Sequence, residues 1–172
     1  MKSETIRFIA VNAIIAAAYA ALTVAVAPLS YGNIQFRFSE ILLFLAFFDK
    51  RFFPGLILGC FIANLFSPMI AYDITFGTAA TVIACAGSYF LGKLVTKATG
   101  KEEIGLFVVP LVGAVANGFL VGLALHLALE LPFWITVLEV ALGECAVLLA
   151  GAFIFLGISK IPVIRRFLTW QY

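Results

Sequence analysis

The chain has 172 residues, of which 64% are hydrophobic and only 12% are charged. Soluble domains have a hydrophobic share of roughly 45–50%, so this composition indicates an integral membrane protein. The formal charge of +2 is small and scattered along the chain, which excludes the clustered basic face of a nucleic-acid-binding protein. The loops are short and no linker separates two parts, so residues 1–172 are expected to form one domain.

Five apolar runs are long enough to cross a bilayer as helices: Phe8–Ala27, Phe52–Ala71, Phe76–Val95, Leu106–Leu129 and Phe133–Ile158. A span needs about 20 such residues to cover a hydrocarbon core of roughly 30 Å. A sixth run, Ile34–Phe48, is shorter and contains two charged residues. Its length alone does not decide whether it also spans the membrane.

The distribution of basic residues decides that question, because cytoplasmic loops carry an excess of Lys and Arg. If Ile34–Phe48 spans, ten of the 11 basic residues lie on the side of the N-terminus and only Arg37 lies opposite. If it does not span, only Lys2 and Arg7 remain on that side. The sequence therefore predicts an all-α bundle of six transmembrane helices with both termini in the cytoplasm. The second helix is expected to be short or to begin within Ile34–Phe38.

The external segment Tyr31–Glu40 places several polar side chains, including Arg37, between two apolar runs. Arg37 and Glu40 are three residues apart, so an ion pair forms if the helix has already begun. Gln35 and Arg37 instead alternate with phenylalanines, which also fits a short extended segment. In either case we expect this segment to shape the cover of a binding pocket.

Two carboxylates, Glu139 and Glu144, fall inside the last predicted span. A carboxylate near the bilayer centre costs about 2.5–3.5 kcal/mol on insertion scales, so each needs a partner or a function. Five residues at ~100° each turn the two side chains ~140° apart, which predicts separate roles. The alternative for Glu144 is a structural hydrogen bond to Asn64, Asn117 or a buried hydroxyl between helices.

The external half of the protein carries five carboxylates and one arginine, which favours a cationic or proton-donating ligand. Further candidates for binding are Asp73 and Asn117, with His126 as either a ligand or a satisfied interfacial side chain. Tyr72 and Trp134 lie at external helix ends, where they form an aromatic belt or a stacking platform for a flat ring. The cysteines are three, show no metal-ligand spacing and are interpreted as buried hydrophobes, so neither a metal nor a cofactor is expected.

Small residues repeat every four positions along the first helix, in two series: Ala13, Ala17 and Ala21, and Ala16 and Ala20. Such a face allows another helix to approach closely. The partner is either a helix of this chain or a separate subunit.

The segment Tyr31–Glu40 reads YGNIQFRFSE and resembles the YGxIQxRxSE signature of the QueT family. That family belongs to the substrate-binding S-components of energy-coupling factor (ECF) importers, which the length and the span count also resemble. The resemblance implies a bacterial plasma-membrane protein that captures a 7-deazaguanine such as preQ1, preQ0 or queuine from outside. It also implies two kinds of partner, a transmembrane coupling protein and two ATPase subunits, and it implies that the coupling protein docks on the alanine face of the first helix.

A guanine-like ring edge offers two N–H donors that one carboxylate can accept together. Glu139, Glu144 or Asp73 can take that edge or an aminomethyl cation, an aromatic side chain can stack on the ring, and Asn117 or Gln35 can read the carbonyl. One alternative is an S-component for another small vitamin. A third interpretation is an intramembrane enzyme using Cys145, His126, Glu139 and Glu144. No nucleophile and base are paired at helical spacing, which argues against it.

Overall fold

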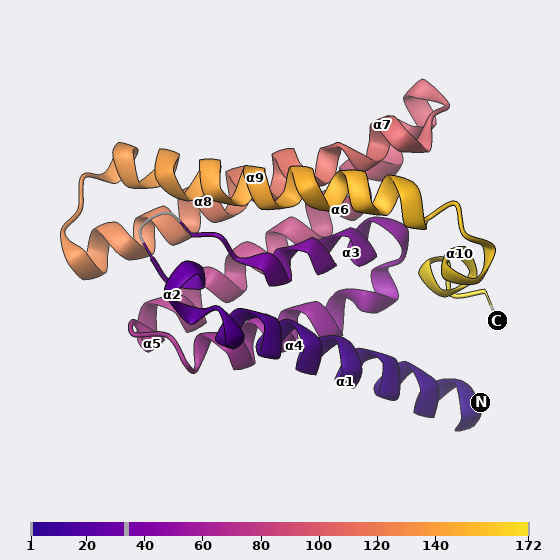
Figure 1. The fold of residues 1–172 in the computed structure, drawn as a ribbon, viewed down its shortest axis with the longest axis horizontal. Helices are drawn as coiled ribbons and strands as arrows, with labels where there is room; N and C mark the ends of the chain where they lie inside the picture. Colours follow the sequence, from indigo (N-terminus) through magenta and orange to yellow (C-terminus); the bar gives the residue numbers. More distant parts are fainter. Residues whose placement is uncertain (1, 33–34, 172) are drawn as a thin grey trace.

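The computed structural model describes residues 2–32 and 35–171, which form helices, turns and short extended segments (Figure 1). No strand occurs in these described ranges. The all-α membrane fold predicted from composition is therefore confirmed.

The long helices of the described chain are α1 (Lys2–Ala25), α6 (Thr78–Thr99), α8 (Val108–Leu129) and α9 (Phe133–Ile158). Shorter helices lie between and after them: α2 (Ala27–Ser30), α3 (Phe44–Phe48), α4 (Phe53–Asn64), α5 (Ile70–Tyr72), α7 (Glu102–Leu106) and α10 (Pro162–Leu168). Two 3₁₀ helices, Phe38–Leu43 and Lys50–Phe52, lead into α3 and α4, and a π-helical turn, Asp73–Gly77, joins α5 to α6.

Local sequence explains several helix ends. Proline occupies the first turn of α2, α4 and α10, where its missing N–H costs no helical hydrogen bond. Gly100 ends α6 with φ 68° and donates its N–H to the carbonyl of Thr96, as a left-handed C-terminal cap requires.

The helices pack as pairs around the segment that contains α3. α8 and α9 form an antiparallel hairpin, α1 pairs with α4, and α6 packs on α8 (Figure 1). The 3₁₀ helix before α3 contacts both α1 and α9, and its neighbours Phe44 and Phe47 are fully buried. The 3₁₀ helix and α3 therefore lie at the centre of the bundle.

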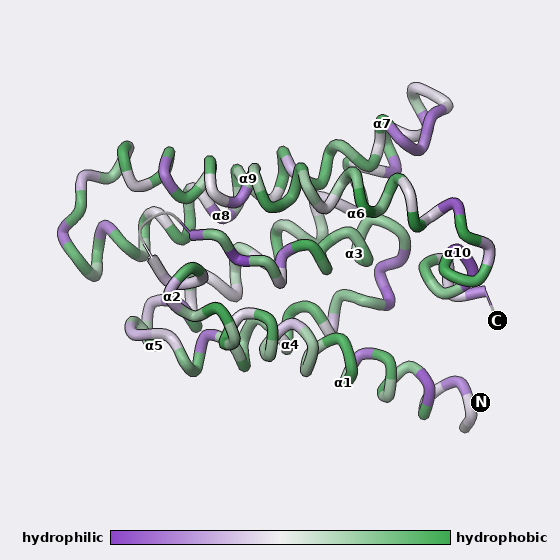
Figure 2. Tube along the Cα trace, in the orientation of Figure 1, coloured by the Kyte–Doolittle hydropathy of each residue, from purple (hydrophilic) through white to green (hydrophobic). Residues whose placement is uncertain are grey.

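The long helices are mostly apolar along their length, whereas polar residues concentrate toward the two ends of the molecule (Figure 2). Leu111, Leu142 and Phe153 expose 66%, 61% and 66% of their surface. A bilayer can cover such a surface, because its hydrocarbon chains replace the apolar contacts that a soluble protein needs.

Within the described residues, helices long and apolar enough to cross a membrane are Ser3–Ala25, Ile70–Thr99, Glu102–Leu129 and Phe133–Ile158. The other two predicted spans are shorter. The 3₁₀ helix and α3 together cover only Phe38–Phe48, as expected for a helix that begins near Phe38. The count of six spans stays a prediction.

The predicted span Phe52–Ala71 is wrong beyond Asn64, where α4 ends. Pro68 cannot donate the N–H that would continue the helix. Polar side chains hold a turn instead: Ser67 Oγ accepts from the N–H of Met69 at 2.9 Å, and Asn64 donates to the carbonyl of Asp73 at 2.7 Å.

Glycines allow the closest helix contacts. A Cβ at Gly59 of α4 would lie 2.7 Å from the Cβ of Tyr19 and 3.0 Å from the Cα of Ala16. In the α8–α9 hairpin, a Cβ at Gly118 would lie 2.9 Å from the Cβ of Ala141. These small residues therefore permit backbone approach inside the chain.

Both termini lie at one end of the bundle together with α10, and α2, α5 and the α8–α9 turn lie at the other (Figure 1). Arg7 and Arg51 line one cavity at the terminal end, and Lys160 and Arg165 line a second cavity with Glu102. The grouping of basic residues agrees with the predicted topology. The cytoplasmic location of this end remains a prediction.

Candidate binding site

The segment before α3 directs its polar side chains into the bundle. Gln35 and Arg37 are only 3% and 2% exposed, whereas Phe38 is 42% exposed and faces outward. This alternation is that of an extended strand-like segment, one of the two alternatives raised by the sequence. Ser39 and Glu40 then enter the 3₁₀ helix and are completely buried.

The predicted ion pair between Arg37 and Glu40 is not formed. Salt bridges within the described ranges join Arg51 to Asp49 and Arg165 to Glu102. Arg37 precedes the 3₁₀ helix with ψ 85°, so its side chain does not share a helical face with Glu40. Only the backbones are linked, because the N–H of Glu40 donates to the carbonyl of Arg37 at 2.9 Å.

Glu40 is held by α1. The hydroxyl of Tyr19 donates a hydrogen bond to Oε1 of Glu40, while Oε2 has no partner among the described residues. One turn further along α1, Thr23 and Ser39 share a hydrogen bond of 2.7 Å. These contacts fix the orientation of the segment and leave one carboxylate oxygen for a ligand.

Arg37 presents unpartnered donors inside the protein. Its Nε and Nη2 atoms have no hydrogen-bond acceptor in the described part of the chain. The guanidinium lies 5.7 Å from the ring centroid of Tyr31, and its charge interacts with those of Glu40 and Asp73. A buried guanidinium with open donors is costly without an acceptor, which makes this position suited to a polar ligand.

Asp73 comes from the π-helical turn that precedes α6. Its side chain accepts a hydrogen bond from Ser67, and its Oδ1 atom has no partner among the described residues. π-Helical turns are frequent at functional sites. This turn thus holds a second buried carboxylate, whose charge acts on Arg37.

Glu144 supplies a third carboxylate from the middle of α9. It is 2% exposed and accepts a hydrogen bond of 3.0 Å from Asn117 of α8, the structural contact expected from one reading of the sequence. The charges of Glu40 and Arg37 also act on Glu144. Glu144 thus joins α9 to α8 inside the bundle.

We define the polar core as six buried residues: Gln35, Arg37, Glu40, Asp73, Asn117 and Glu144. Three of them are carboxylates, and one is an arginine whose charge interacts with those of all three. All six are predicted binding residues. Arg37 and Glu40 were expected in a segment that covers the pocket, but both side chains are buried inside the bundle.

Four other predicted binding residues lie outside this core. Glu139 and Tyr72 are half-buried, and Tyr72 stacks on Phe76 with ring centroids 6.5 Å apart. Trp134 exposes 69% of its surface, as in an interfacial belt. His126 is satisfied by the carbonyl of Leu131 at 2.6 Å.

The alanine series of α1 face two directions. Ala16 and Ala20 are buried, with Ala16 beside Gly59 of α4. Ala13, Ala17 and Ala21 are exposed. The first series therefore packs inside the chain, and the second leaves a narrow small-residue face open.

Two residues of the site escaped the sequence analysis, namely Tyr19 and Ser67, which hold Glu40 and Asp73. A spacing signal exists for Tyr19: Asn12, Tyr19 and Thr23 follow the face of α1 that also carries Ala16, and all are buried. Polar residues repeating on one helical face mark an inward side.

A cavity of about 250 Å³ lies at the end opposite the termini, lined by Ala27, Pro28, Tyr31, Phe66 and Pro68. Tyr31 lines this cavity, contacts Arg37 and donates its hydroxyl to the carbonyl of Ala63 at 2.6 Å. Tyr31 therefore links the outer cavity to the polar core. Within the described ranges, no group of His, Cys, Asp or Glu is arranged to hold a metal ion.

The fold and the polar core define a multi-pass α-helical membrane protein with a charged site enclosed between its helices. Residues 9–160 match the family model described as QueT transporter. The chain belongs to the QueT transporter family. As a member of this family, the protein is a transporter and not an enzyme. It is also a multi-pass protein of the plasma membrane.

A curated relative supports the same assignment along nearly the whole chain. The queuosine precursor transporter QueT of Lactococcus lactis subsp. cremoris (strain MG1363) is 33% identical over 163 residues, covering 92% of this chain and 95% of the relative. No solved structure is significantly similar to the chain. The family resemblance seen in the segment Tyr31–Glu40 is thus confirmed.

Proposed function

We propose that this transporter is the substrate-binding S-component of an ECF importer and captures a queuosine precursor, a 7-deazaguanine such as preQ1, preQ0 or queuine. Family membership and the name of the Lactococcus relative support this ligand class. The observation that carries the proposal is the polar core, in which three carboxylates and one arginine are buried inside an apolar bundle.

The chemistry of the ligand complements that core. A 7-deazaguanine presents two neighbouring N–H donors, which a carboxylate accepts in bidentate fashion, and a carbonyl, which a guanidinium can bind. Glu40, Asp73 and Arg37 each have a polar atom without a partner among the described residues. These atoms can form hydrogen bonds with the ligand. Binding would then remove the free-energy cost of leaving buried polar atoms without a hydrogen bond.

The charge balance favours a cationic substituent on the ring. With every group ionised, three carboxylates and one arginine leave the core with two net negative charges. The aminomethyl ammonium of preQ1 neutralises one of them, whereas the nitrile of preQ0 neutralises none. We therefore expect preQ1 to bind more tightly than preQ0.

The exposed alanines of α1 support the partner part of the proposal. Ala13, Ala17 and Ala21 form a small-residue face on the bilayer-facing side of the helix, and such a face admits a helix of another subunit at close range. The coupling protein would dock there, and its two ATPase subunits would supply the energy. The buried residues Ala16 and Ala20 take no part in that contact.

A thermal-stability assay on the purified chain in detergent tests the ligand class. A ligand that binds only the folded state raises stability by about 2.7 kcal/mol at a concentration one hundred times its Kd. We expect preQ1 to raise the unfolding temperature and riboflavin, thiamine and biotin to leave it unchanged. Stabilisation by one of these vitamins, with none by preQ1 or its analogues, would contradict the proposal.

A further inference from the structure

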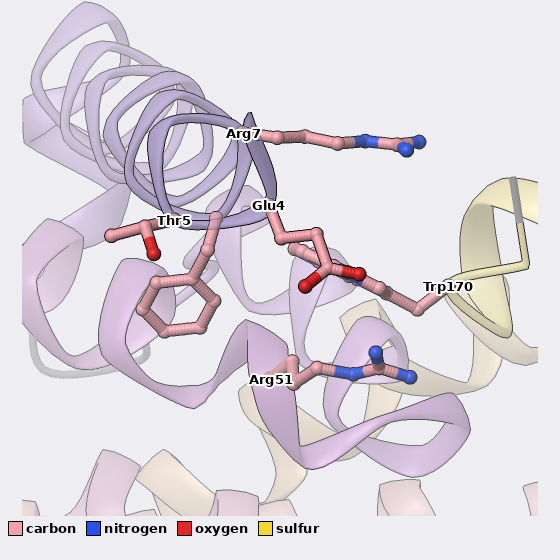
Figure 3. Close-up of a pocket in the computed structure, with 6 residues that line it drawn as sticks. Glu4, Thr5, Arg7, Arg51 and Trp170 are labelled. Carbon is pink, nitrogen blue, oxygen red and sulfur yellow. The ribbon is translucent and has the colours of Figure 1, made fainter. Parts of the chain in front are cut away.

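A second polar cavity, of about 400 Å³, lies at the end of the molecule that carries both termini. It opens between the first turns of α1 and the chain after α10, and is lined by Glu4, Thr5, Arg7, Phe8, Arg51 and Trp170 (Figure 3). None of these residues belongs to the polar core. The transport function proposed above leaves the cavity unexplained.

Two arginines from different elements flank this cavity. Arg7 comes from α1 and Arg51 from the 3₁₀ helix before α4, and both guanidinium groups extend in the same direction (Figure 3). The carboxylate of Glu4 and the side chain of Trp170 lie between them. These two guanidinium groups are the positively charged groups that line the cavity.

Neighbouring contacts hold Arg51 in this position. Its Nε and Nη2 donate to Asp49 at 3.0 and 2.7 Å, and its guanidinium carbon lies 5.1 Å from the ring centroid of Trp170. Burial by itself raises the pKa of Asp49, but the hydrogen bonds from Arg51 outweigh it and hold the pKa of that carboxyl below its ordinary value. Asp49 thus stays ionised and fixes the guanidinium at neutral pH.

The charge around the cavity is positive. Among the residues that line it, Arg7 and Arg51 carry two positive charges, against the one negative charge of Glu4. The net charge of +1 favours an anionic ligand.

Aromatic side chains line the cavity, and aliphatic side chains are exposed on the flanking helices. Phe8 and Trp170 pack with ring centroids 6.1 Å apart inside it. Ile6 of α1 and Val163 of α10 expose 67% and 79% of their surface nearby in sequence. A cavity with charged groups on one side, tryptophan at its wall and exposed aliphatic side chains on the flanking helices has the features of a bilayer interface.

We propose that this cavity binds the headgroup of an anionic phospholipid, such as phosphatidylglycerol. The phosphate lies between Arg7 and Arg51, because guanidinium forks match phosphate oxygens in bidentate geometry. Glu4 accepts a hydrogen bond from a headgroup hydroxyl. The acyl chains follow the exposed aliphatic surface of α1, so the lipid ties the terminal segment to α1. Basic cavities between helices at the cytoplasmic interface are known to select anionic lipids.

Lipid retention by the full-length protein tests this inference. The chain is delipidated in detergent and titrated with phosphatidylglycerol, phosphatidylethanolamine or phosphatidylcholine, and bound lipid is counted by native mass spectrometry. Phosphatidylglycerol should be retained preferentially. Each arginine removed should weaken its binding about fivefold.

The variants separate a specific site from general charge. Arg7→Gln leaves the Asp49–Arg51 pair intact and tests the site in a folded protein, and Arg7→Gln with Arg51→Gln removes both guanidinium groups. The matched control, Lys97→Gln with Lys101→Gln, removes two exposed basic residues elsewhere and should retain phosphatidylglycerol as the unmodified chain does. Binding of preQ1 should be equal in all of them.

Four results would overturn the inference. Equal retention of phosphatidylglycerol and phosphatidylcholine excludes headgroup selection, and equal loss in the control variant assigns the effect to net charge. Preference for phosphatidylethanolamine would show that the cavity instead binds the ammonium group of that headgroup, through Glu4. Full stabilisation of the chain by inorganic phosphate alone assigns it to a soluble anion.

Discussion

Replacing Glu144 by glutamine removes one negative charge from the polar core while keeping the shape of the side chain. The remaining amide oxygen can still accept the hydrogen bond that Asn117 donates at 3.0 Å, so the α8–α9 hairpin should stay folded. Glu144 is 2% exposed, which means that water does not replace a lost interaction with the ligand. A hydrogen bond to a charged group contributes about 1.5–3 kcal/mol, and about 1.4 kcal/mol corresponds to a tenfold change in Kd.

Glu144→Gln should therefore weaken preQ1 binding by roughly 10- to 150-fold, measured by isothermal titration calorimetry on the purified chain. Glu130→Gln is the control, because Glu130 is exposed and caps the end of α8, and its affinity should equal that of the unmodified protein. Glu139→Gln should have a smaller effect than Glu144→Gln, since Glu139 lies outside the polar core. Unchanged preQ1 affinity in a folded Glu144→Gln variant would refute the assignment of Glu144 to the binding site.

Three further substitutions test other parts of the account. Gly59→Ala should destabilise the fold by about 1–3 kcal/mol, because the new Cβ would lie 2.7 Å from the Cβ of Tyr19. The control is Gly157→Ala, whose Cβ meets no atom within 4 Å and should not destabilise the fold. Equal unfolding temperatures of the two variants would count against the α1–α4 packing. Ala17→Leu should leave preQ1 affinity intact and abolish uptake into cells that express the coupling proteins, and continued uptake would show that the exposed face of α1 is not a docking surface. Arg37→Lys keeps the positive charge but loses the planar guanidinium with its paired N–H donors. The affinity for preQ1 should therefore fall by about tenfold, the equivalent of one hydrogen bond to a charged group. An unchanged Kd would exclude Arg37 from ligand contact.

The sequence predicted the longest helices well, because a continuous apolar run bounded by helix breakers leaves few alternatives. The predicted and observed limits of α9 coincide at Phe133 and Ile158. The run Phe52–Ala71 was misread as one span, because hydropathy does not register that Pro68 and the hydrogen bonds of Asn64 and Ser67 end α4 early.

The polar core was only partly accessible to sequence reasoning. Polar residues within apolar runs identified Glu144 and Asn117 as candidates, since such residues are costly in a membrane without a partner or a function. The excess of carboxylates on the external side added Asp73. Their mutual arrangement depends on which distant helices meet. That information is long-range, so the contact of Tyr19 with Glu40 and the depth of Glu40 could not be read from local spacing.

The central claim is that a queuosine precursor binds between the carboxylates and the arginine of the polar core. Determination of the structure of this chain with bound preQ1 tests the claim most directly. We expect the 7-deazaguanine ring to lie inside the bundle, with Arg37 and at least one of Glu40, Asp73 and Glu144 within hydrogen-bond distance. A preQ1 molecule bound elsewhere, with the polar core unchanged and closed, would contradict the account.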